Sequence, residues 1–373
     1  MFAAFTPPER LLLGPGPSPV SASVLAALAK PTLGHLDPAF VGMMDEVKVL
    51  LRAAMQTTNA LTIPISAPGS AGMEACFANL LEPGDTVVVC INGVFGGRMR
   101  ENALRMGAKV VTVEDDFGQP VNPAKVEAAL KANPQTKVLA FVHAETSTGV
   151  RSDAQSLCAL ARAHAALSIV DAVTSLGGIA LAVDDWGIDA LYSGSQKCLS
   201  APPGLSPLSF SDAAVAALKQ RKHKVQSWFL DLNLVMNYWA GDGGRSYHHT
   251  APVNMLYALH EALRLLVLEG LPAAWARHQQ NHLLLADGLR DLDLEFLVDA
   301  DYRLPQLNTI KVPDSVDEAA VRRTLLLDHG IEIGAGLGPL AGKVWRIGLM
   351  GAGSQPEIVA RVLSALSKAL KRS

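Results

Sequence analysis

The residue best suited to chemistry in this sequence is Lys197, the single lysine of the stretch 193–204. Small residues surround it and a Pro-Pro-Gly turn follows it, so a large ligand can approach the backbone there. Desolvation lowers the pKa of a lysine, which makes its neutral amine available as a nucleophile. Taken alone, the stretch fits a reactive lysine and an ordinary surface lysine on a loop about equally well.

A carboxylate lies one predicted element upstream of this lysine. The apolar run 167–170 is typical of a buried parallel strand, and Asp171 follows at its C-terminal end, the edge at which open α/β sheets bind ligands. A lysine and a strand-end aspartate suit pyridoxal phosphate. The lysine forms a Schiff base with this cofactor, and the carboxylate keeps the pyridinium nitrogen protonated, so that the ring acts as an electron sink. Lys197 and Asp171 are therefore the predicted catalytic residues.

Two motifs resemble the class V aminotransferases, specifically their alanine–glyoxylate and serine–glyoxylate aminotransferase branch. They are Asp-Ala-Val-Thr-Ser-Leu-Gly-Gly at 171–178 and Tyr-Ser-Gly-Ser-Gln-Lys at 192–197. The similarity runs nearly end to end, from Gly-Pro-Gly-Pro at 14–17 to Arg-Ile-Gly at 346–348. It implies an α/β chain with fold type I of the PLP-dependent transferases: a large domain with a mostly parallel sheet and a smaller α+β C-terminal domain.

Length and composition limit the classes of protein. The 373 residues are too many for one compact core and suit a large and a small domain. The formal net charge of -3 points to neither nucleic acid nor a membrane surface as a partner. Apolar runs have the length of strands, the first residues lack the basic region of a signal peptide, and the four cysteines show no metal spacing. These features predict a cytoplasmic protein with reduced thiols.

The pattern along the chain predicts three parts. Residues 1–18 are rich in Pro and Gly and are expected to form an extended arm rather than a packed element. Residues 19–270 form the large, cofactor-binding domain, in which strands alternate with helices, and residues 271–373 form the small domain. The resemblance implies that the arm lies over a partner subunit and that Gly16 lies near the substrate.

The predicted elements follow from periodicity and from start and stop signals. In the large domain we expect helices at 19–30, 38–56, 72–81, 96–106, 123–131, 152–164 and 253–268, strands at 61–65, 86–91, 109–113, 137–142, 167–170, 188–192 and 205–210, a basic surface helix after 210, and an irregular stretch at 225–247. In the small domain we expect helices at 272–290, 316–329 and 355–370 and strands at 294–298, 306–312 and 343–347.

A phosphate cradle is predicted at 66–74, where a glycine- and serine-rich turn enters a helix directly after a strand. The free N–H groups and the dipole of a helix N-terminus suit a phosphate, although small residues also serve close strand–helix packing. Gly69, Ser70 and Ala71 are the predicted donors, because Pro68 has no N–H.

The resemblance also implies residues around the cofactor ring. Phe95 is expected to stack on one face of the ring, and the alternative is that Phe95 is an ordinary core phenylalanine. Val173 is expected to pack on the opposite face of the ring. Thr146 hydrogen-bonds the side of the ring that bears the hydroxyl oxygen, and Gln196 is a further cofactor-binding residue. Glu145 fits a general base or a structural residue, and we favour the structural role because Lys197 already moves the proton.

A third motif, Tyr-His-His-Thr at 247–250, bears on the assembly. Adjacent histidines do not share a helix face and no third ligand is in view, so we predict no metal site. The resemblance implies instead that Tyr247 and Thr250 reach the cofactor phosphate of a neighbouring subunit, which predicts a homodimer with shared active sites. His35, in an upstream turn, fits a residue at the mouth of the site or an ordinary turn residue.

The predicted substrate anchor is Arg346, an arginine within an apolar strand of the small domain. Because an unpaired buried guanidinium is costly, this residue type indicates a partner. A two-pronged grip on the α-carboxylate of a substrate explains it, and an internal salt bridge is the alternative.

Together these residues predict a PLP-dependent aminotransferase that moves an amino group from alanine or serine to glyoxylate or a similar 2-oxo acid by a ping-pong mechanism. Other class V donors, such as ureidoglycine or aminoethylphosphonate, stay open. A lyase of the cysteine desulfurase kind is less favoured because no cysteine follows Cys198. A non-catalytic binding protein is a further alternative, against which the intact pair of Asp171 and Lys197 argues.

Overall fold

The computed structural model of the chain describes residues 2–240 and 245–371. Its largest element is a seven-stranded sheet with the strand order β2-β10-β9-β8-β5-β3-β4. Strands β3, β4, β5, β8 and β9 pair in parallel, and β10 runs antiparallel to β9 and β2, which confirms the predicted α/β class and the mostly parallel large sheet. The strands are β2 (Leu61–Ile65), β3 (Thr86–Ile91), β4 (Lys109–Glu114), β5 (Thr136–Val142), β8 (Leu167–Asp171), β9 (Ala190–Tyr192) and β10 (Ser206–Phe210).

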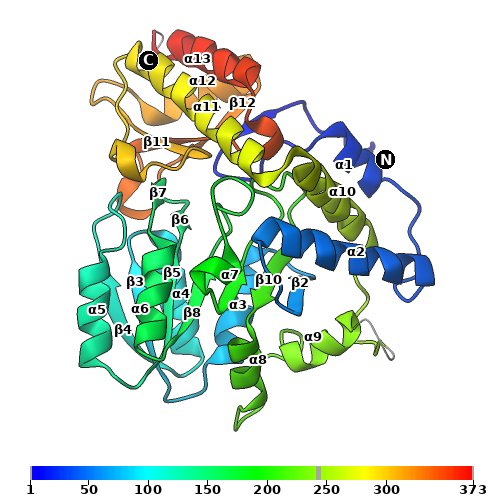
Figure 1. Ribbon diagram of the computed structural model, residues 1–373. Helices are drawn as coiled ribbons and strands as arrows, with labels where there is room; N and C mark the ends of the chain where they lie inside the picture. The colour runs from blue at the N-terminus through cyan, green and yellow to red at the C-terminus, as the bar shows by residue number, and fades with distance from the viewer. Residues whose placement is uncertain (1, 241–244, 372–373) are drawn as a thin grey trace.

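Helices cover the faces of this sheet (Figure 1). They are α3 (Gly69–Leu80), α4 (Val94–Arg105), α5 (Pro123–Ala132), α6 (Ala154–Ala163), α7 (Val183–Trp186) and α8 (Asp212–Lys219). The cap predicted for α5 is present, because the Asn122 side chain accepts the N–H of Ala124 at 2.9 Å. Helices α3 and α4 begin before the predicted positions 72 and 96, since each starts at the turn directly after its strand.

Three further helices pack together beside the large sheet (Figure 1). They are α1 (Ala22–Leu28), α2 (Pro38–Met55) and α10 (Val253–Glu269). The predicted cap of α2 is present, with Asp37 accepting the N–H of Ala39 at 2.8 Å. The prediction that 225–247 is an irregular stretch was wrong for residues 232–239. Asp231 caps an amphipathic helix there, α9 (Leu232–Trp239). Residues 241–244 of that stretch lie outside the described residues.

A second sheet, with the order β1-β12-β13-β11, packs against helices α11, α12 and α13 in the C-terminal part (Figure 1). Its strands are β1 (Leu11–Leu13), β11 (Leu307–Lys311), β12 (Ile331–Ala335) and β13 (Val344–Gly348), and its helices are α11 (Leu271–Arg290), α12 (Glu318–His329) and α13 (Pro356–Leu370). Short 3-10 turns lie at η1 (Ala300–Tyr302), η2 (Gly338–Leu340) and η3 (Gly351–Gly353).

Two predictions for this sheet were wrong, and one of its strands was missed. Residues 11–13 are a packed strand and not a free arm, because Leu13 is fully buried and β1 pairs in parallel with β12. Strand β12 was not predicted at all. The stretch 294–298 is not a strand, since only Phe296 forms an isolated bridge to Ile310.

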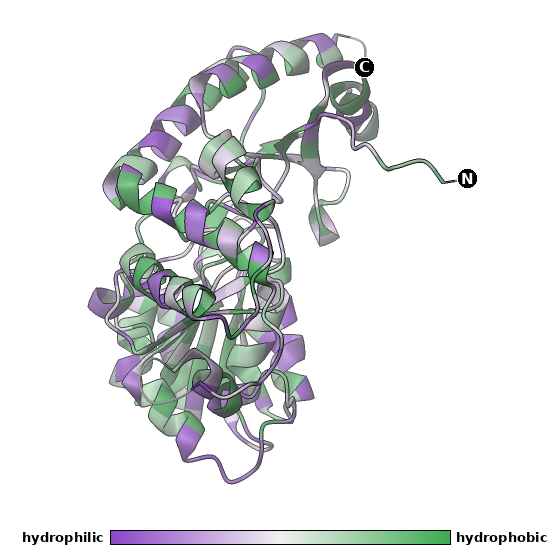
Figure 2. Cartoon of the chain, turned by 90° about the vertical axis from the view of Figure 1, so that its right-hand side faces the viewer, coloured by the Kyte–Doolittle hydropathy of each residue, from purple (hydrophilic) through white to green (hydrophobic). Residues whose placement is uncertain are grey.

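Two hydrophobic clusters form the main cores. One joins the seven-stranded sheet to its helices and reaches Ala274 at the start of α11, and the other joins Leu13 to the interior of the C-terminal sheet. Figure 2 shows polar positions along the outer helices and the first residues extending away from the body. Among the described residues, no helix combines the length and the apolar character needed to cross a membrane. The predicted boundary at residues 270–271 falls between α10 and α11 and stays a prediction.

Candidate active site

Asp171 ends β8 in the middle of the large sheet, and each oxygen of its buried carboxylate accepts one hydrogen bond from the protein. Oδ1 accepts the N–H of Val173 at 2.8 Å, and Oδ2 accepts the hydroxyl of Tyr192 at 2.6 Å. Burial raises the pKa of Asp171 to about 6, although both hydrogen bonds and the positive charge of Lys197 act in the opposite direction. The site therefore holds an ionisable carboxyl at the sheet edge where the sequence places it.

Lys197 lies in the turn between β9 and β10, and its side chain is 8% exposed. This burial excludes the alternative that Lys197 is an ordinary surface lysine. Burial, together with the positive charge of Arg346, lowers the pKa of Lys197 to about 8, while Cys198 and Asp171 oppose the shift. Its Nζ donates a hydrogen bond to the carbonyl oxygen of Pro15. The amine is thus desolvated and close to the point of losing its proton at neutral pH.

The N-terminal segment closes over this lysine. Ser18 donates its N–H to Gln196 O at 2.9 Å and its hydroxyl to Lys197 O at 2.7 Å. Gly16 has φ +101°, and a Cβ there would lie 2.5 Å from Lys197 Nζ. A glycine is required at this position both for the backbone conformation and for the space that the lysine occupies. The structure therefore places Gly16 directly at the amine.

The start of α3 lies beside the lysine turn, as a phosphate cradle requires. A Cβ on Gly69 would lie 3.3 Å from Ser193 O and 3.4 Å from Val173 Cγ2. The N–H of Ala71 already donates to Pro68 O at 2.8 Å. Of the three predicted donors, Gly69 and Ser70 keep N–H groups without an acceptor in the described residues, as expected at a helix N-terminus.

Three of the residues predicted to contact the cofactor ring are Phe95, Val173 and Thr146. Phe95 and Val173 are half-buried and pack against the core, so Phe95 is not a fully enclosed core side chain. The Arg98 guanidinium lies 4.7 Å from the centroid of the Phe95 ring. The Thr146 hydroxyl is buried and lies 2.6 Å from the hydroxyl of Thr174.

Arg346, in the middle of β13, links the C-terminal sheet to this site. Its Nε donates to Ala335 O at 2.8 Å and its Nη1 to Thr146 O at 3.0 Å. The side chain is 5% exposed, and burial lowers its pKa to about 10 against the negative charge of Glu145. No carboxylate of the described residues lies within ion-pair distance, so the structure does not show the alternative of an internal salt bridge. One edge of the guanidinium is free, because Nη2 has no hydrogen-bond acceptor among the described residues.

Together these groups fit pyridoxal phosphate. The buried Oε1 of Gln196, next to the lysine, lacks a hydrogen-bond partner among the described residues. A helix start with free N–H groups suits a phosphate, a carboxyl suits a ring nitrogen, and a desolvated amine suits an aldehyde carbon. These donors and acceptors come from separate elements, yet the folded chain brings them to one sheet edge.

Tyr247 and Thr250 are not brought to the lysine of their own chain. Both side chains are exposed, Tyr247 by 62%, and the Tyr247 ring lies 5.3 Å from the ring of His35. Their neighbour His249 instead reaches the phosphate cradle, with Nε2 2.7 Å from Ser66 Oγ. Burial lowers the pKa of His249 to about 4, with the charges of His248 and His35 as further causes, so His249 is neutral at pH 7.

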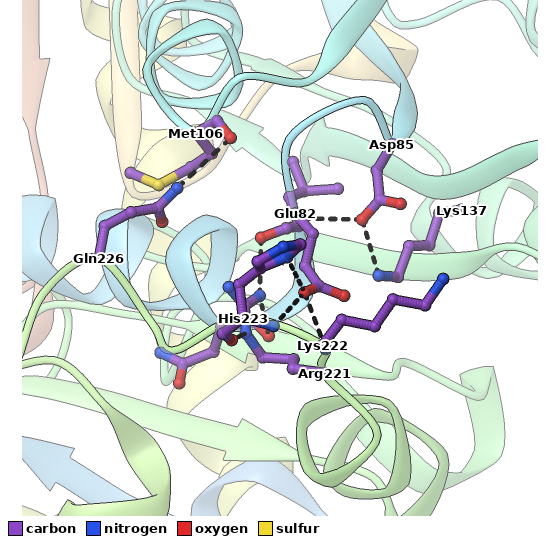
Figure 3. Close-up of polar contacts among 10 residues, drawn as sticks. Glu82, Asp85, Met106, Lys137, Arg221, Lys222, His223 and Gln226 are labelled. Atoms are coloured by element: carbon purple, nitrogen blue, oxygen red, sulfur yellow. Dashed lines mark hydrogen bonds and ion pairs between the residues drawn. The ribbon is translucent and has the colours of Figure 1, made fainter.

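A polar network anchors residues 221–223 (Figure 3). Glu82 accepts the N–H groups of Lys222 at 2.9 Å and His223 at 2.8 Å. Arg221 donates to the carbonyl oxygens at the end of α3, and Lys137 donates to Asp85 at 2.7 Å. The network holds residues 221–223 against the C-terminal end of α3 and the turn that leads into β3.

Sequence reasoning missed several residues of the site. Tyr192 lies beside Asp171 in the register of β8 and β9, a position that shows only when the two strands are paired. Pro15 and Ser18 bond Lys197 from the N-terminal segment, 182 and 179 positions away in sequence, so no local pattern indicates these contacts. Ser147 bonds Glu145 within the turn after β5, which the small hairpin of β6 (Ala144–Glu145) and β7 (Val150–Arg151) holds.

Comparisons with known proteins agree with this geometry. The family model of class V aminotransferases matches residues 23–350. The alanine–glyoxylate aminotransferase of Oryctolagus cuniculus is 43% identical over 366 residues, which cover 98% of this chain and 93% of that protein. The (S)-ureidoglycine–glyoxylate transaminase of Bacillus subtilis (strain 168) is 37% identical, with 98% and 91% covered.

One of the solved structures that match nearly the whole chain illustrates this agreement. It is an alanine–glyoxylate aminotransferase from Nostoc sp., with 48% identity and a TM-score of 0.97 over 99% of this chain and 97% of that one. The near-complete cover in both directions means that the two chains share both sheets and the arrangement of the helices between them.

Proposed function

This chain belongs to the class V aminotransferases, and we propose that it moves an amino group from a small amino acid, alanine or serine, to glyoxylate or a similar 2-oxo acid. The reaction is a ping-pong exchange with pyridoxal phosphate as cofactor. The observation that carries the proposal is the buried Lys197 amine, whose charge interacts with both the Asp171 carboxyl and the Arg346 guanidinium. The relatives named alanine–glyoxylate aminotransferase support the choice of substrates.

Each part of the cofactor has residues that would hold it. The free N–H groups of Gly69 and Ser70 would bind the phosphate, and the N–H of Ala71 would join them on leaving Pro68 O. Asp171 would bind the ring nitrogen, and Thr146 and Gln196 would bind the polar edge of the ring. Phe95 and Val173 would contact its two faces. When bound, pyridoxal phosphate supplies an electron sink for the electron pair left at the substrate Cα.

The protein residues then divide the remaining work. Arg346 has a free edge of its guanidinium and binds the α-carboxylate of donor and acceptor in turn. Lys197 Nζ takes the proton from the substrate Cα, for which a pKa of about 8 is well matched. Asp171 stays ionised because Tyr192 and Val173 donate to it. Gly16 leaves room at the amine for the substrate.

We also propose that the active enzyme is a homodimer in the cytoplasm. Exposed Tyr247 and Thr250 would complete the phosphate site of the partner subunit, which explains why they do not reach Lys197 of their own chain. The cysteines at 76, 90, 158 and 198 are free and buried, as expected in a reducing compartment.

A half-reaction screen tests the proposed function. The purified protein, loaded with pyridoxal phosphate, is mixed with one amino donor at a time while the visible absorbance of the cofactor is followed. Alanine or serine is expected to convert the absorbance, and glyoxylate is expected to restore it. Failure of both donors would refute the proposed substrates.

A second donor class has support from one relative. The protein from Bacillus subtilis acts on (S)-ureidoglycine by name and is 37% identical. The same screen includes ureidoglycine, and faster conversion with it than with alanine or serine would assign this chain to that activity.

A further inference from the structure

We propose that Glu145 and Ser147 form a positioning pair, which caps helix α4 from another segment of the chain and connects it to Arg346. The inference rests on the proposed function, in which Phe95 of α4 contacts the cofactor ring and Arg346 binds the substrate carboxylate. It assigns Glu145 a positioning role and not that of a general base.

The cap is visible in the contacts of the first turn of α4. Its N-cap residue, Gly93, has no side chain, so its own segment supplies no side-chain cap. Ser147 Oγ accepts the N–H of Val94 at 2.9 Å, and Glu145 Oε2 accepts the N–H of Phe95 at 3.2 Å. Two N–H groups that a helix start leaves unpaired are therefore satisfied by a turn about fifty residues away in sequence.

The two side chains of the pair also hold each other. Glu145 Oε1 accepts the N–H of Ser147 at 3.0 Å and its hydroxyl at 2.6 Å. A carboxylate at this place gains from the positive end of the helix dipole. A Cβ on Gly93 would meet the Glu145 carboxyl and would lie 2.6 Å from Ser147 Oγ. Because Gly93 has no side chain, the Glu145 carboxyl and the Ser147 hydroxyl have room to cap α4.

The same turn touches the substrate arginine. Thr146, between the two members of the pair, accepts Nη1 of Arg346 through its carbonyl oxygen at 3.0 Å. The carboxyl of Glu145 is also the charged group that raises the pKa of Arg346 against burial. Displacing residues 145–147 would consequently disturb both the ring-contacting helix and the charge environment of the guanidinium.

A general base would need an oxygen free to accept a substrate proton. Both oxygens of Glu145 instead accept hydrogen bonds from protein groups of the site wall, and the side chain is fully buried. Burial raises the pKa of Glu145 to about 7, while the bonds from Ser147 lower it. These donors fix the carboxyl in place, which is what positioning requires.

Hydrogen exchange in the cofactor-free protein tests the cap without any turnover. In Glu145→Ala and Ser147→Ala, the amides of Val94 and Phe95 are expected to exchange about 2- to 30-fold faster, the effect of losing a helix cap. The matched control is Asp153→Ala, because Asp153 caps α6 with the same bonds, to the N–H and hydroxyl of Ser156, outside the site. It should accelerate exchange at the start of α6 and leave α4 unchanged. Parental exchange of the α4 amides in both pair variants would overturn the cap.

The kinetic test uses Glu145→Gln, which keeps the shape and removes the charge. The amide nitrogen of a glutamine cannot accept the bonds that one Glu145 oxygen now accepts, so residues 145–147 should shift and move the carbonyl of Thr146 that holds Arg346. In the loaded enzyme we therefore expect KM for the amino acid to rise roughly tenfold with a smaller change in kcat, and the preference for an amino acid over its decarboxylated amine to shrink. The visible circular dichroism of the bound cofactor should change as Phe95 shifts, whereas Asp153→Ala should alter neither. Unchanged preference together with unchanged dichroism would overturn the positioning role. If the parent converts no amino donor, the proposed function fails, while the exchange experiment still decides the cap.

Discussion

Tyr192 lies opposite Asp171 on the neighbouring parallel strand and donates its hydroxyl to Asp171 Oδ2 at 2.6 Å. Both side chains are buried, so the bond to the ionised carboxyl is charge-assisted and shielded from water. Burial raises the pKa of Asp171 to about 6, and the bond from Tyr192 lowers it. The phenol thereby helps to keep Asp171 negative at neutral pH.

The first prediction concerns this phenol. Tyr192→Phe removes a bond that lowers the pKa of Asp171, so this pKa should rise and the carboxylate should be lost at a higher pH. The acidic limb of kcat/KM should move up by about one to two pH units, which corresponds to the worth of a hydrogen bond to a charged group. A pH profile with the best donor measures the shift, and Tyr302→Phe, a partly exposed tyrosine, serves as control. An unmoved acidic limb would remove Tyr192 from the mechanism.

The second prediction is that Asp171→Asn binds the cofactor but loses reaction rate. The neutral amide cannot stabilise the protonated ring nitrogen, so the half-reaction should slow by roughly 10²–10³, the effect of removing one preorganised electrostatic partner. Stopped-flow absorbance measures the rate, and absorbance at equilibrium measures the cofactor content. A parental rate would show that Asp171 is not the ring partner.

The third prediction is that Lys197→Ala abolishes turnover while the fold and the assembly persist. The variant lacks the amine that takes the Cα proton, and loss of such a group typically costs about 10²–10⁴ in rate. Because the lysine is desolvated, its removal should not lower the melting temperature. Turnover, melting temperature and sedimentation are compared with those of the parent, and a substantial fraction of parental turnover would contradict the assignment.

The fourth prediction follows from the pKa of Lys197, which burial lowers to about 8. A lowered pKa means that the amine gives up its proton at a lower pH than a free lysine, whose pKa is about 10.4. Acylation of Lys197 in the cofactor-free protein, read by peptide mass spectrometry, should therefore rise through pH 8 and level off above it. The unfolded protein is the control, in which the same lysine should react only at higher pH. Equal profiles in the two states would contradict a desolvated amine.

The fifth prediction is that Arg346→Lys weakens the binding of the amino donor and the binding of the 2-oxo acid acceptor alike. Both present an α-carboxylate, and a lysine cannot reproduce the two-pronged geometry of a guanidinium. We expect a loss of about 2–5 kcal/mol in apparent binding, the cost of leaving a desolvated charge without its partner. Affinity is measured for an amino acid and for its decarboxylated amine, and only the first should fall. A loss of stability and cofactor content without this discrimination would indicate a structural arginine.

Much of the site could be predicted from the sequence because its key residues stand in local patterns. Asp171 ends an apolar strand, Lys197 precedes a Pro-Pro-Gly turn, and Gly69 starts a helix after a strand. In an open parallel sheet such strand ends meet at one edge, so the residues at them gather without further information. Arg346 could be predicted because a charged residue within an apolar strand is costly to bury unless a partner binds it.

The tertiary structure alone decided the contacts that depend on which segments pair. The sequence predicts that Leu11–Leu13 belongs to an extended arm, but burial against β12 makes it a strand of the C-terminal sheet. The bond from Tyr192 to Asp171 needs the register of β8 and β9, and the cap of α4 needs Glu145 to reach a helix about fifty residues before it. Local propensity describes a few neighbouring residues, whereas these partners are chosen by the burial of side chains from distant segments. For that reason the sequence alone determined the chemical groups of the site, and packing decided what holds them in place.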